Sequence, residues 1–507
     1  MVEFAKRALL PFTVFVTGGC VLIIEIVAVR MLAPFFGNTI YSFSSVISVV
    51  LAALSIGYWI GGRLADRYPS KKLFFGIIAV SGLLVLLMQV LQAGLLPALG
   101  YDLPLDTGPL IVSMILFFVP SFMLGMLSPF AVALEKREVK GQGVGTTAGE
   151  IFFFSTLGSI AGSLAAGFVL IPMFGVSSII VGVGILLFML GMIPVTFFGL
   201  QNKFAVAAVL FAGGTLLLAA GGPALADNVI YSRDGLYEKI TVAEGVYNGQ
   251  SVRFLKQDTS NSAAMYLDSD ELVYDYTKYY ALYDVFEPEV KRALVMGGGA
   301  YSIPKALLAD LPDALVDVSE IEPLLVSLSK KYFRLEDDPR LTHYIKDGRR
   351  MLHDVQSRYD LIFSDVYHSM YSVPAHFTTK EFMQLAHDRL TENGVFVANL
   401  IGNLEAGEES FIWSQVKTMQ QVFPEVYVFA VSSPLYEDTQ NIVVVGANSP
   451  ERIDPNDQKW RQSRYQVVRE IAGHYVPTER MALERYPVLA DDYAPVDYLV
   501  SKVLPKR

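Results

Sequence analysis

Long apolar runs, separated by short polar stretches, fill the first 222 positions of the chain. An α-helix needs roughly 20 apolar residues to cross about 30 Å of hydrocarbon. Seven runs meet that length, so residues 1–222 are predicted to form a membrane α-helical bundle of about seven spans. These runs cover residues 9–33, 39–61, 73–97, 108–134, 149–172, 175–199 and 203–222.

The pattern changes after residue 222. Short alternating stretches around an Asn-Gly pair predict a β-hairpin within 229–257, in a small domain spanning 223–290. From residue 291 to 507, strand-like and helix-like stretches alternate, which predicts a mainly parallel sheet with helices on both faces. Strands are expected at 293–296, 315–319, 342–346, 360–364, 394–400, 425–431 and 441–446, and helices at 303–310, 323–332, 379–390 and 409–422.

Charge separates the two halves in the same way. Hydrophobic residues make up 52% of the chain, and its mean hydropathy is +0.41. Residues 1–222 hold 11 Lys/Arg and 8 Asp/Glu, whereas residues 223–507 hold 29 and 42. The acidic half is poorly suited to nucleic acid and well suited to a small cationic ligand. The single Cys20 excludes disulfides, and the histidines lack the spacing of a metal site, so no metal is predicted.

The sequence leaves the side of the membrane open. Basic clusters such as Arg63/Arg67 mark cytoplasmic loops, and an odd number of spans then puts the acidic half outside. A nucleotide-dependent enzyme is expected inside. The segment "GGRLADRYPSKK" resembles a loop of major facilitator transporters, and Glu25 and Glu150 lie in or near predicted spans, so transport stays an alternative.

Candidate chemistry gathers where the predicted strands end. In parallel sheets the ligand binds beyond the carboxyl ends of the strands. The first strand ends at Gly297-Gly298-Gly299, the second at Glu320, the third at Asp347-Gly348 and the fourth at Asp365. Glycines let a backbone approach a ligand closely, and an acid after the second strand can accept hydrogen bonds from ribose hydroxyls.

This set favours an S-adenosyl nucleoside over a dinucleotide. The chain has neither a G-x-G-x-x-G loop at this point nor a Walker A lysine, so a phosphate cradle is not predicted. A sulfonium nucleoside carries no phosphate. The prediction is an S-adenosyl co-substrate with no permanently bound cofactor.

Several motifs resemble the spermidine synthase (polyamine aminopropyltransferase) family, and the whole chain resembles its bacterial membrane-fused branch. "DELVYDY" is similar to D-E-x-x-Y-H-E, "GGGAYS" to G-G-G-D-G-G, "EIEP" to E-I-D-P and "YDLIFSD" to Y-D-V-I-x-x-D. The resemblance implies a β-hairpin part before a Rossmann-like domain of methyltransferase type. It also implies transfer of an aminopropyl group from decarboxylated S-adenosylmethionine to an amine such as putrescine.

The resemblance assigns roles to individual residues. Asp365 and Tyr274 would be catalytic, and Gly297, Gly298, Gly299, Glu320, Asp347 and Gly348 would hold the nucleoside. Several positions depart from the family pattern: Ala300 replaces the acid of the glycine motif, and His368 replaces the second acid after the fourth strand. Glu238, Asp275, Tyr367, His368 and Tyr371 are further candidates for binding the amine substrate.

The leading interpretation is a transferase in a bacterial inner membrane, spanning it several times. Its partners would be the lipid bilayer and a cationic amine, with a homodimer left open by analogy to the soluble family. One alternative is an S-adenosylmethionine-dependent methyltransferase on the same fold, favoured by Ala300 and His368. Another is a nucleoside or polyamine sensor, or a transporter, that does not turn its ligand over.

Overall fold

The computed structural model describes residues 2–100, 102–139, 141–197, 228–286, 289–367, 373–407, 409–449 and 452–503. The chain divides into two compact units, one formed by Met1–Ala226 and the other by Asp227–Lys506.

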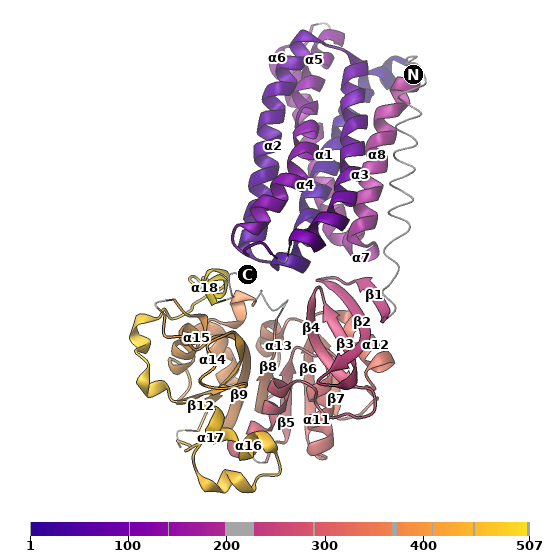
Figure 1. Cartoon of the computed structure of the whole chain (residues 1–507). Helices are drawn as coiled ribbons and strands as arrows, with labels where there is room; N and C mark the ends of the chain where they lie inside the picture. Colours follow the sequence, from indigo (N-terminus) through magenta and orange to yellow (C-terminus); the bar gives the residue numbers. More distant parts are fainter. Residues whose placement is uncertain are drawn as a thin grey trace. The chain divides into compact units, whose positions relative to one another are not determined.

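The N-terminal unit is a bundle of apolar helices (Figure 1). Five stretches are long and apolar enough to cross a membrane, whereas the sequence predicted seven. The run predicted at 175–199 corresponds to α8, whose apolar stretch Val176–Met192 is shorter than the other five. The run at 203–222 lies outside the described residues. The helices are α1 (Val2–Phe36), α2 (Ile40–Arg67), α3 (Lys71–Leu99), α4 (Gly108–Gly125), α5 (Leu127–Glu138), α6 (Val144–Ala165), η1 (Ala166–Leu170), α7 (Ile171–Met173) and α8 (Val176–Phe197).

Four antiparallel strands open the second unit: β1 (Val229–Asp234), β2 (Lys239–Tyr247), β3 (Gln250–Gln257) and β4 (Ser260–Tyr266), in that order across the sheet. The Asn-Gly pair turns between β2 and β3, with both residues at positive φ, as the sequence predicted. Ile240, Val242 and Leu255 of this sheet share a core cluster with Leu325 and Leu328 of α12. The sheet therefore packs on the α/β part and belongs to the same compact unit.

An eight-stranded sheet forms the centre of the second unit. Its strand order is β12-β10-β11-β9-β8-β5-β6-β7. The five strands from β9 to β7 are parallel, and β11 runs antiparallel to both β9 and β10. All seven predicted strands are present: β5 (Arg292–Met296), β6 (Leu315–Glu320), β7 (Leu341–Ile345), β8 (Tyr359–Ser364), β9 (Leu390–Gly402), β10 (Glu425–Ala430) and β11 (Gln440–Ala447); β12 (Tyr475–Val476) is additional.

Helices cover both faces of this sheet because its strands are apolar on both sides. On β5, Leu294 and Met296 enter one core cluster, whereas Ala293 and Val295 enter another. The first cluster includes α13 (Gly348–Asp354), α14 (Lys380–Asp388), α15 (Phe411–Gln420) and α18 (Val496–Val503). The second includes the 3-10 helix η2 (Asp275–Leu282), α10 (Tyr283–Phe286), α11 (Ser302–Asp310), α16 (Gln466–Arg469) and α17 (Ile471–His474). The small four-stranded sheet packs on α12 (Pro323–Tyr332).

The C-terminal segment "DDYAPVDYL" docks onto the α/β part through its first acid. Asp491 pairs with both terminal nitrogens of Arg349, at 2.7 and 2.6 Å, and accepts a 2.7 Å hydrogen bond from Thr379. A two-pronged Arg–carboxylate pair is among the stronger polar contacts in proteins. This segment therefore fixes the start of α14, next to the loop that carries Asp347.

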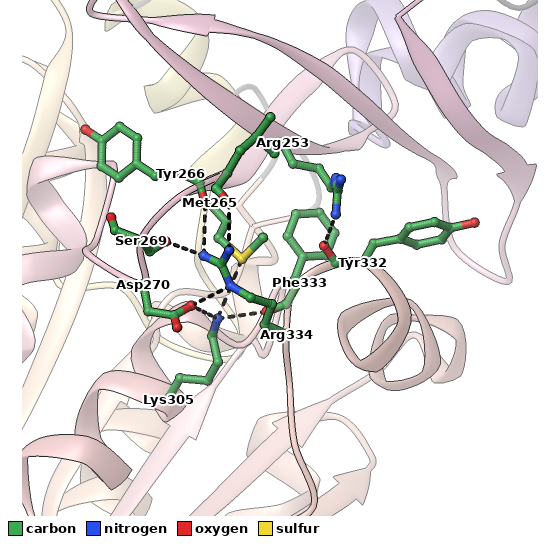
Figure 2. A network of polar contacts seen from close by, with 10 residues as sticks. Arg253, Met265, Tyr266, Ser269, Asp270, Lys305, Tyr332, Phe333 and Arg334 are labelled. Carbon is green, nitrogen blue, oxygen red and sulfur yellow. Dashed lines mark hydrogen bonds and ion pairs between the residues drawn. The ribbon is translucent and has the colours of Figure 1, made fainter.

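A polar network holds the segment that leads into the "DELVYDY" motif (Figure 2). Asp270 accepts hydrogen bonds from Lys305 of α11 and from Arg334 after α12, each at 3.1 Å. Arg334 also donates to the backbone carbonyls of Tyr266, at 2.9 Å, and Leu267, at 3.0 Å. The first acid of the motif is thus a structural clamp between the small sheet and the α/β part.

Replacing Asp270 with Asn should weaken this clamp. Burial opposes ionisation of Asp270, but the hydrogen bonds and charges of Lys305 and Arg334 outweigh it and lower the pKa of this carboxyl. Because the side chain is largely exposed, we expect Asp270→Asn to cost only about 1 kcal/mol of unfolding free energy. Thermal unfolding of the full chain measures this loss of stability. Glu271→Gln, at the exposed neighbouring position, should leave the transition unchanged, and equal melting of both variants would contradict the assignment.

Candidate functional site

A cavity of about 830 Å³ opens at the carboxyl ends of β5, β6 and β8, where the sheet meets the small four-stranded sheet. A pocket of this size suits a small organic ligand. Eleven of the predicted site residues line it, from the glycine loop, the strand ends and the hairpin motif: Gly297, Gly298, Gly299, Glu320, Asp347, Gly348, Asp365, Tyr274, Glu238, Asp275 and Tyr367. The other two, His368 and Tyr371, lie outside the described residues.

The glycine loop turns sharply after β5. Gly297 has a φ of +88°, and a Cβ built on it would lie 2.2 Å from the backbone oxygen of Asp365. Only glycine fits such a close approach of two strand ends. The loop then runs into α11, with Tyr301 at a left-handed φ of +59°. This geometry explains the first glycine, and it places the N–H groups of Gly298 and Gly299 toward the end of β6.

Glu320, the last residue of β6, is the acceptor for those N–H groups. One carboxylate oxygen accepts from Gly298 at 2.8 Å and from Gly299 at 3.1 Å. The other accepts from the backbone of Glu322 at 2.9 Å. Burial raises the pKa of Glu320, although these N–H bonds oppose the rise. Glu320 lines the cavity but also holds the loop in shape, a role that the sequence did not predict.

Asp347 caps the start of α13. Its carboxylate accepts from the backbone of Arg350 at 2.9 Å and lies 2.9 Å from His376 Nε2. Burial alone would raise the pKa of Asp347, but the hydrogen bond from His376 and the backbone N–H groups lower it. Asp347 therefore stays ionised in the lining of the cavity, and the His376 that partners it also lines the cavity.

Glu238, just before β2, is the least satisfied carboxyl at the site. Its Oε1 accepts a short hydrogen bond from Gln257, whereas its buried Oε2 has no hydrogen-bond partner in the described part of the chain. Burial raises the pKa of Glu238 well above its usual range, and the carboxylate of Asp258 adds to this effect. A buried acceptor without a partner costs free energy unless a ligand or water satisfies it.

Glu238→Gln should therefore stabilise the protein at alkaline pH. The folded state holds a proton on Glu238 above the ordinary pKa of about 4.3, so stability falls as pH rises from that value toward the raised pKa. Glutamine keeps the acceptor for Gln257 and does not titrate. We expect the variant to melt about 3 °C above the parent at about pH 8, with a smaller difference at about pH 4.5. A difference independent of pH would contradict protonation of Glu238.

Asp365 follows β8 directly, and both of its carboxylate oxygens have side-chain donors. Tyr276 donates to Oδ2 at 3.0 Å and Asn399 donates to Oδ1 at 2.8 Å. Burial raises the pKa of Asp365, and these two hydrogen bonds oppose the rise. A buried carboxylate with a raised pKa is a stronger base than a solvated one, as acid–base chemistry near neutral pH requires.

The remaining candidates differ in what they touch. The buried hydroxyl of Tyr274 has no hydrogen-bond partner among the described residues, so it is available to a ligand. Tyr367 accepts a 2.6 Å hydrogen bond from the backbone of Ile401, which holds its phenol in place. Asp275 is exposed and forms a 2.7 Å ion pair with Lys278.

Sequence reasoning missed Tyr276, Asn399 and Asn441. Asn399 lies near the carboxyl end of β9. Ligands bind beyond the carboxyl ends of parallel strands, and applying this rule to a fifth strand would have found Asn399. Asn441, near the start of the antiparallel strand β11, donates to Asn399 Oδ1 at 2.9 Å. Tyr276 carried no such signal, because its contact with Asp365 joins residues 89 positions apart.

The strand order, with five parallel strands extended by the antiparallel β11 and β10, defines a Rossmann-like domain of methyltransferase type. Its cavity lies at the switch point between β5 and β8, where such sheets bind ligands. The class is thus a Rossmann-like α/β domain with a cavity of ligand size at its switch point.

Comparison with known proteins is more specific. Residues 282–455 match the family described as the spermine/spermidine synthase domain. A polyamine aminopropyltransferase of Vibrio vulnificus is 24% identical over 52% of this chain and 83% of its own length. Polyamine aminopropyltransferase 1 of Streptomyces coelicolor is 24% identical over 97% of this chain and 94% of its own length. A probable spermidine synthase from Corynebacterium glutamicum aligns with a TM-score of 0.45 at 21% identity, covering 52% of this chain and 98% of that protein.

The chain therefore carries a spermine/spermidine synthase domain in its C-terminal half, fused behind an N-terminal helical region. The resemblance drawn from the motifs is confirmed, and so is the transferase prediction, because these homologues are polyamine aminopropyltransferases.

Proposed function

We propose that the protein is a membrane-anchored aminopropyltransferase that uses decarboxylated S-adenosylmethionine and a polyamine such as putrescine. The observation that carries the proposal is that one cavity is lined by Asp365, by the Tyr274 hydroxyl, which has no hydrogen-bond partner among the described residues, and by the glycine loop with Glu320. Five stretches able to cross a membrane support the anchoring in a bacterial inner membrane.

The chemistry proposed for this site uses the residues in distinct roles. The loop of Gly297, Gly298 and Gly299, with Glu320, Asp347 and Gly348, would hold the nucleoside. The neutral amine attacks the carbon next to the sulfonium, so a C–N bond forms while the C–S bond breaks and its electron pair goes to sulfur. Asp365 accepts the proton that the nitrogen loses, and methylthioadenosine leaves. Holding the nucleophile and the sulfonium in line supplies much of the rate.

Product analysis of the full chain in nanodiscs tests the proposal. Decarboxylated S-adenosylmethionine and putrescine are supplied together, and mass spectrometry follows methylthioadenosine and the aminopropylated amine. Formation of both products in equal amounts is expected. Binding of the nucleoside without any product would favour a sensor, and failure to bind any S-adenosyl compound would overturn the enzyme assignment.

Ala300 supports a second candidate, an S-adenosylmethionine-dependent methyltransferase. Ala300 lines the cavity at the position where the resembled motif has an acid, and it is 1% exposed within the core cluster of Ile240 and Leu325. Because position 300 lacks a carboxylate, it neither attracts a cationic aminopropyl tail nor repels the carboxylate of ordinary S-adenosylmethionine. Supplying that donor in the same assay separates the two, because methyl transfer releases S-adenosylhomocysteine.

A further inference from the structure

A row of side-chain hydrogen bonds surrounds the proposed base at the wall of the cavity, which Tyr276, Asn399 and Asn441 also line. Tyr276 of η2 and Asn399 of β9 each donate to one oxygen of Asp365, at 3.0 and 2.8 Å. Asn441 of β11 donates to Asn399 at 2.9 Å. Two segments far apart in the sequence therefore meet at one carboxylate, and a third supports it through Asn399.

The direction of these bonds is set by chemistry. A carboxylate can only accept, and Asn399 must turn its amide nitrogen toward Asp365 because its oxygen accepts from Asn441. Tyr276 is a donor as well. Burial, and next the Asp365 carboxylate, raise the pKa of the Tyr276 phenol well above its ordinary value, so it stays protonated.

The two neighbouring tyrosines have different surroundings. The rings of Tyr274 and Tyr276 lie nearly parallel, with centroids 6.1 Å apart. The Tyr276 hydroxyl is engaged with Asp365, whereas the Tyr274 hydroxyl has no partner in the described part of the chain. Tyr274 is thus free to meet a substrate, and Tyr276 acts on Asp365.

We propose that Tyr276 is a positioning residue that, together with Asn399 and Asn441, keeps Asp365 ionised and oriented to take the proton of the attacking amine. The proposal rests on the proposed function. These donors occupy one acceptor position on each oxygen, which leaves the other positions for a substrate in the cavity that Asp365 lines. Position 276 is a glutamate in the motif that "DELVYDY" resembles, whereas this chain has a tyrosine there, whose hydroxyl donates to Asp365.

The pH dependence follows from the groups around Asp365. Among the described residues, the titratable groups near it are the phenols of Tyr274, Tyr276 and Tyr367, whose pKa values are all raised by burial. None of them titrates near neutral pH. Glu238 and Glu320 also line the cavity with raised pKa values, but they are common to the parent and a Tyr276 variant. A shift of the acid limb between the two proteins should therefore report the protonation of Asp365.

Tyr276→Phe tests the proposal through that limb. The variant should move the acid limb of kcat/KM for the amine to higher pH, with roughly a tenfold loss at about pH 7 that shrinks as the pH rises. Affinity for the nucleoside should not change. Tyr279→Phe is the control on the same helix, since its ring packs on Phe429 and its hydroxyl has no hydrogen-bond partner in the described residues. An unmoved limb, or an equal loss at every pH, would overturn the proposal.

A second readout does not depend on turnover. The infrared carboxyl band that Asp365→Asn removes identifies Asp365, and its titration can be followed in the full chain without substrate. The midpoint should move to higher pH in Tyr276→Phe and stay in place in Tyr279→Phe. If the parent protein turns over no S-adenosyl donor, the proposed function fails, yet this shift still decides the role of Tyr276. An unchanged midpoint would refute that role.

Discussion

Asp365→Asn should abolish most turnover while leaving nucleoside binding intact. The amide cannot accept the proton of the amine. Tyr276 and Asn399 each donate a hydrogen bond to one oxygen of Asp365, so the NH₂ group of the amide would face one of these two donors. Removal of a general base costs about 10²–10⁴-fold in kcat, and we expect a loss of about 10³-fold. Methylthioadenosine release measures kcat, and calorimetry with the same nucleoside measures binding.

Asp360→Asn is the matched control for this substitution. Asp360 lies at the other end of β8 and accepts from the backbone N–H groups of Lys291 and Arg292, at 2.8 and 2.9 Å. An amide oxygen can accept the same two bonds, and the NH₂ group can donate to the Thr391 hydroxyl, which donates to the other oxygen of Asp360 at 2.9 Å. Turnover in this variant should stay near that of the parent. Full activity in Asp365→Asn would remove this residue from the chemistry, and loss of nucleoside binding would assign it to the nucleoside instead.

Gly297→Ala should have the largest effect on the fold of the second unit. The added methyl group would lie 2.2 Å from the backbone oxygen of Asp365, and the φ of +88° is itself unfavourable for alanine. The ends of β5 and β8 would have to separate. We expect a loss of about 3 kcal/mol or more in unfolding free energy, together with loss of nucleoside binding.

Gly299→Ala separates the steric clash of the added methyl group from the cost of a left-handed φ. Its φ of +51° is also left-handed, but an added Cβ has only Ala263 near it, at 3.9 Å. The cost should be confined to the backbone conformation, about 1–2 kcal/mol. Thermal unfolding of the two full-length variants gives the comparison. Equal stability of both would show that the strand ends do not approach as closely as described.

The local pattern of apolar and polar residues was sufficient to predict the strands of the second unit. Short runs of mostly apolar residues such as 293–296 and 315–319 are strands. Both faces of a parallel sheet are buried, so successive residues of its strands are apolar. The acids at the strand ends also followed from sequence, since parallel strands bring their carboxyl ends to one edge. In the first unit, apolar runs predicted seven spans, and five stretches meet that requirement among the described residues.

The sequence by itself determined the order of strands and helices, the ligand-binding edge of the sheet and the residues Glu320, Asp347 and Asp365 on it. Only the tertiary structure decided how those groups are used. Glu320 accepts the loop N–H groups because β5 and β6 are neighbours, and Tyr276 contacts Asp365 because η2 packs on the sheet through Tyr279, Tyr280 and Leu282. Such contacts depend on the packing of distant segments, which no local periodicity encodes.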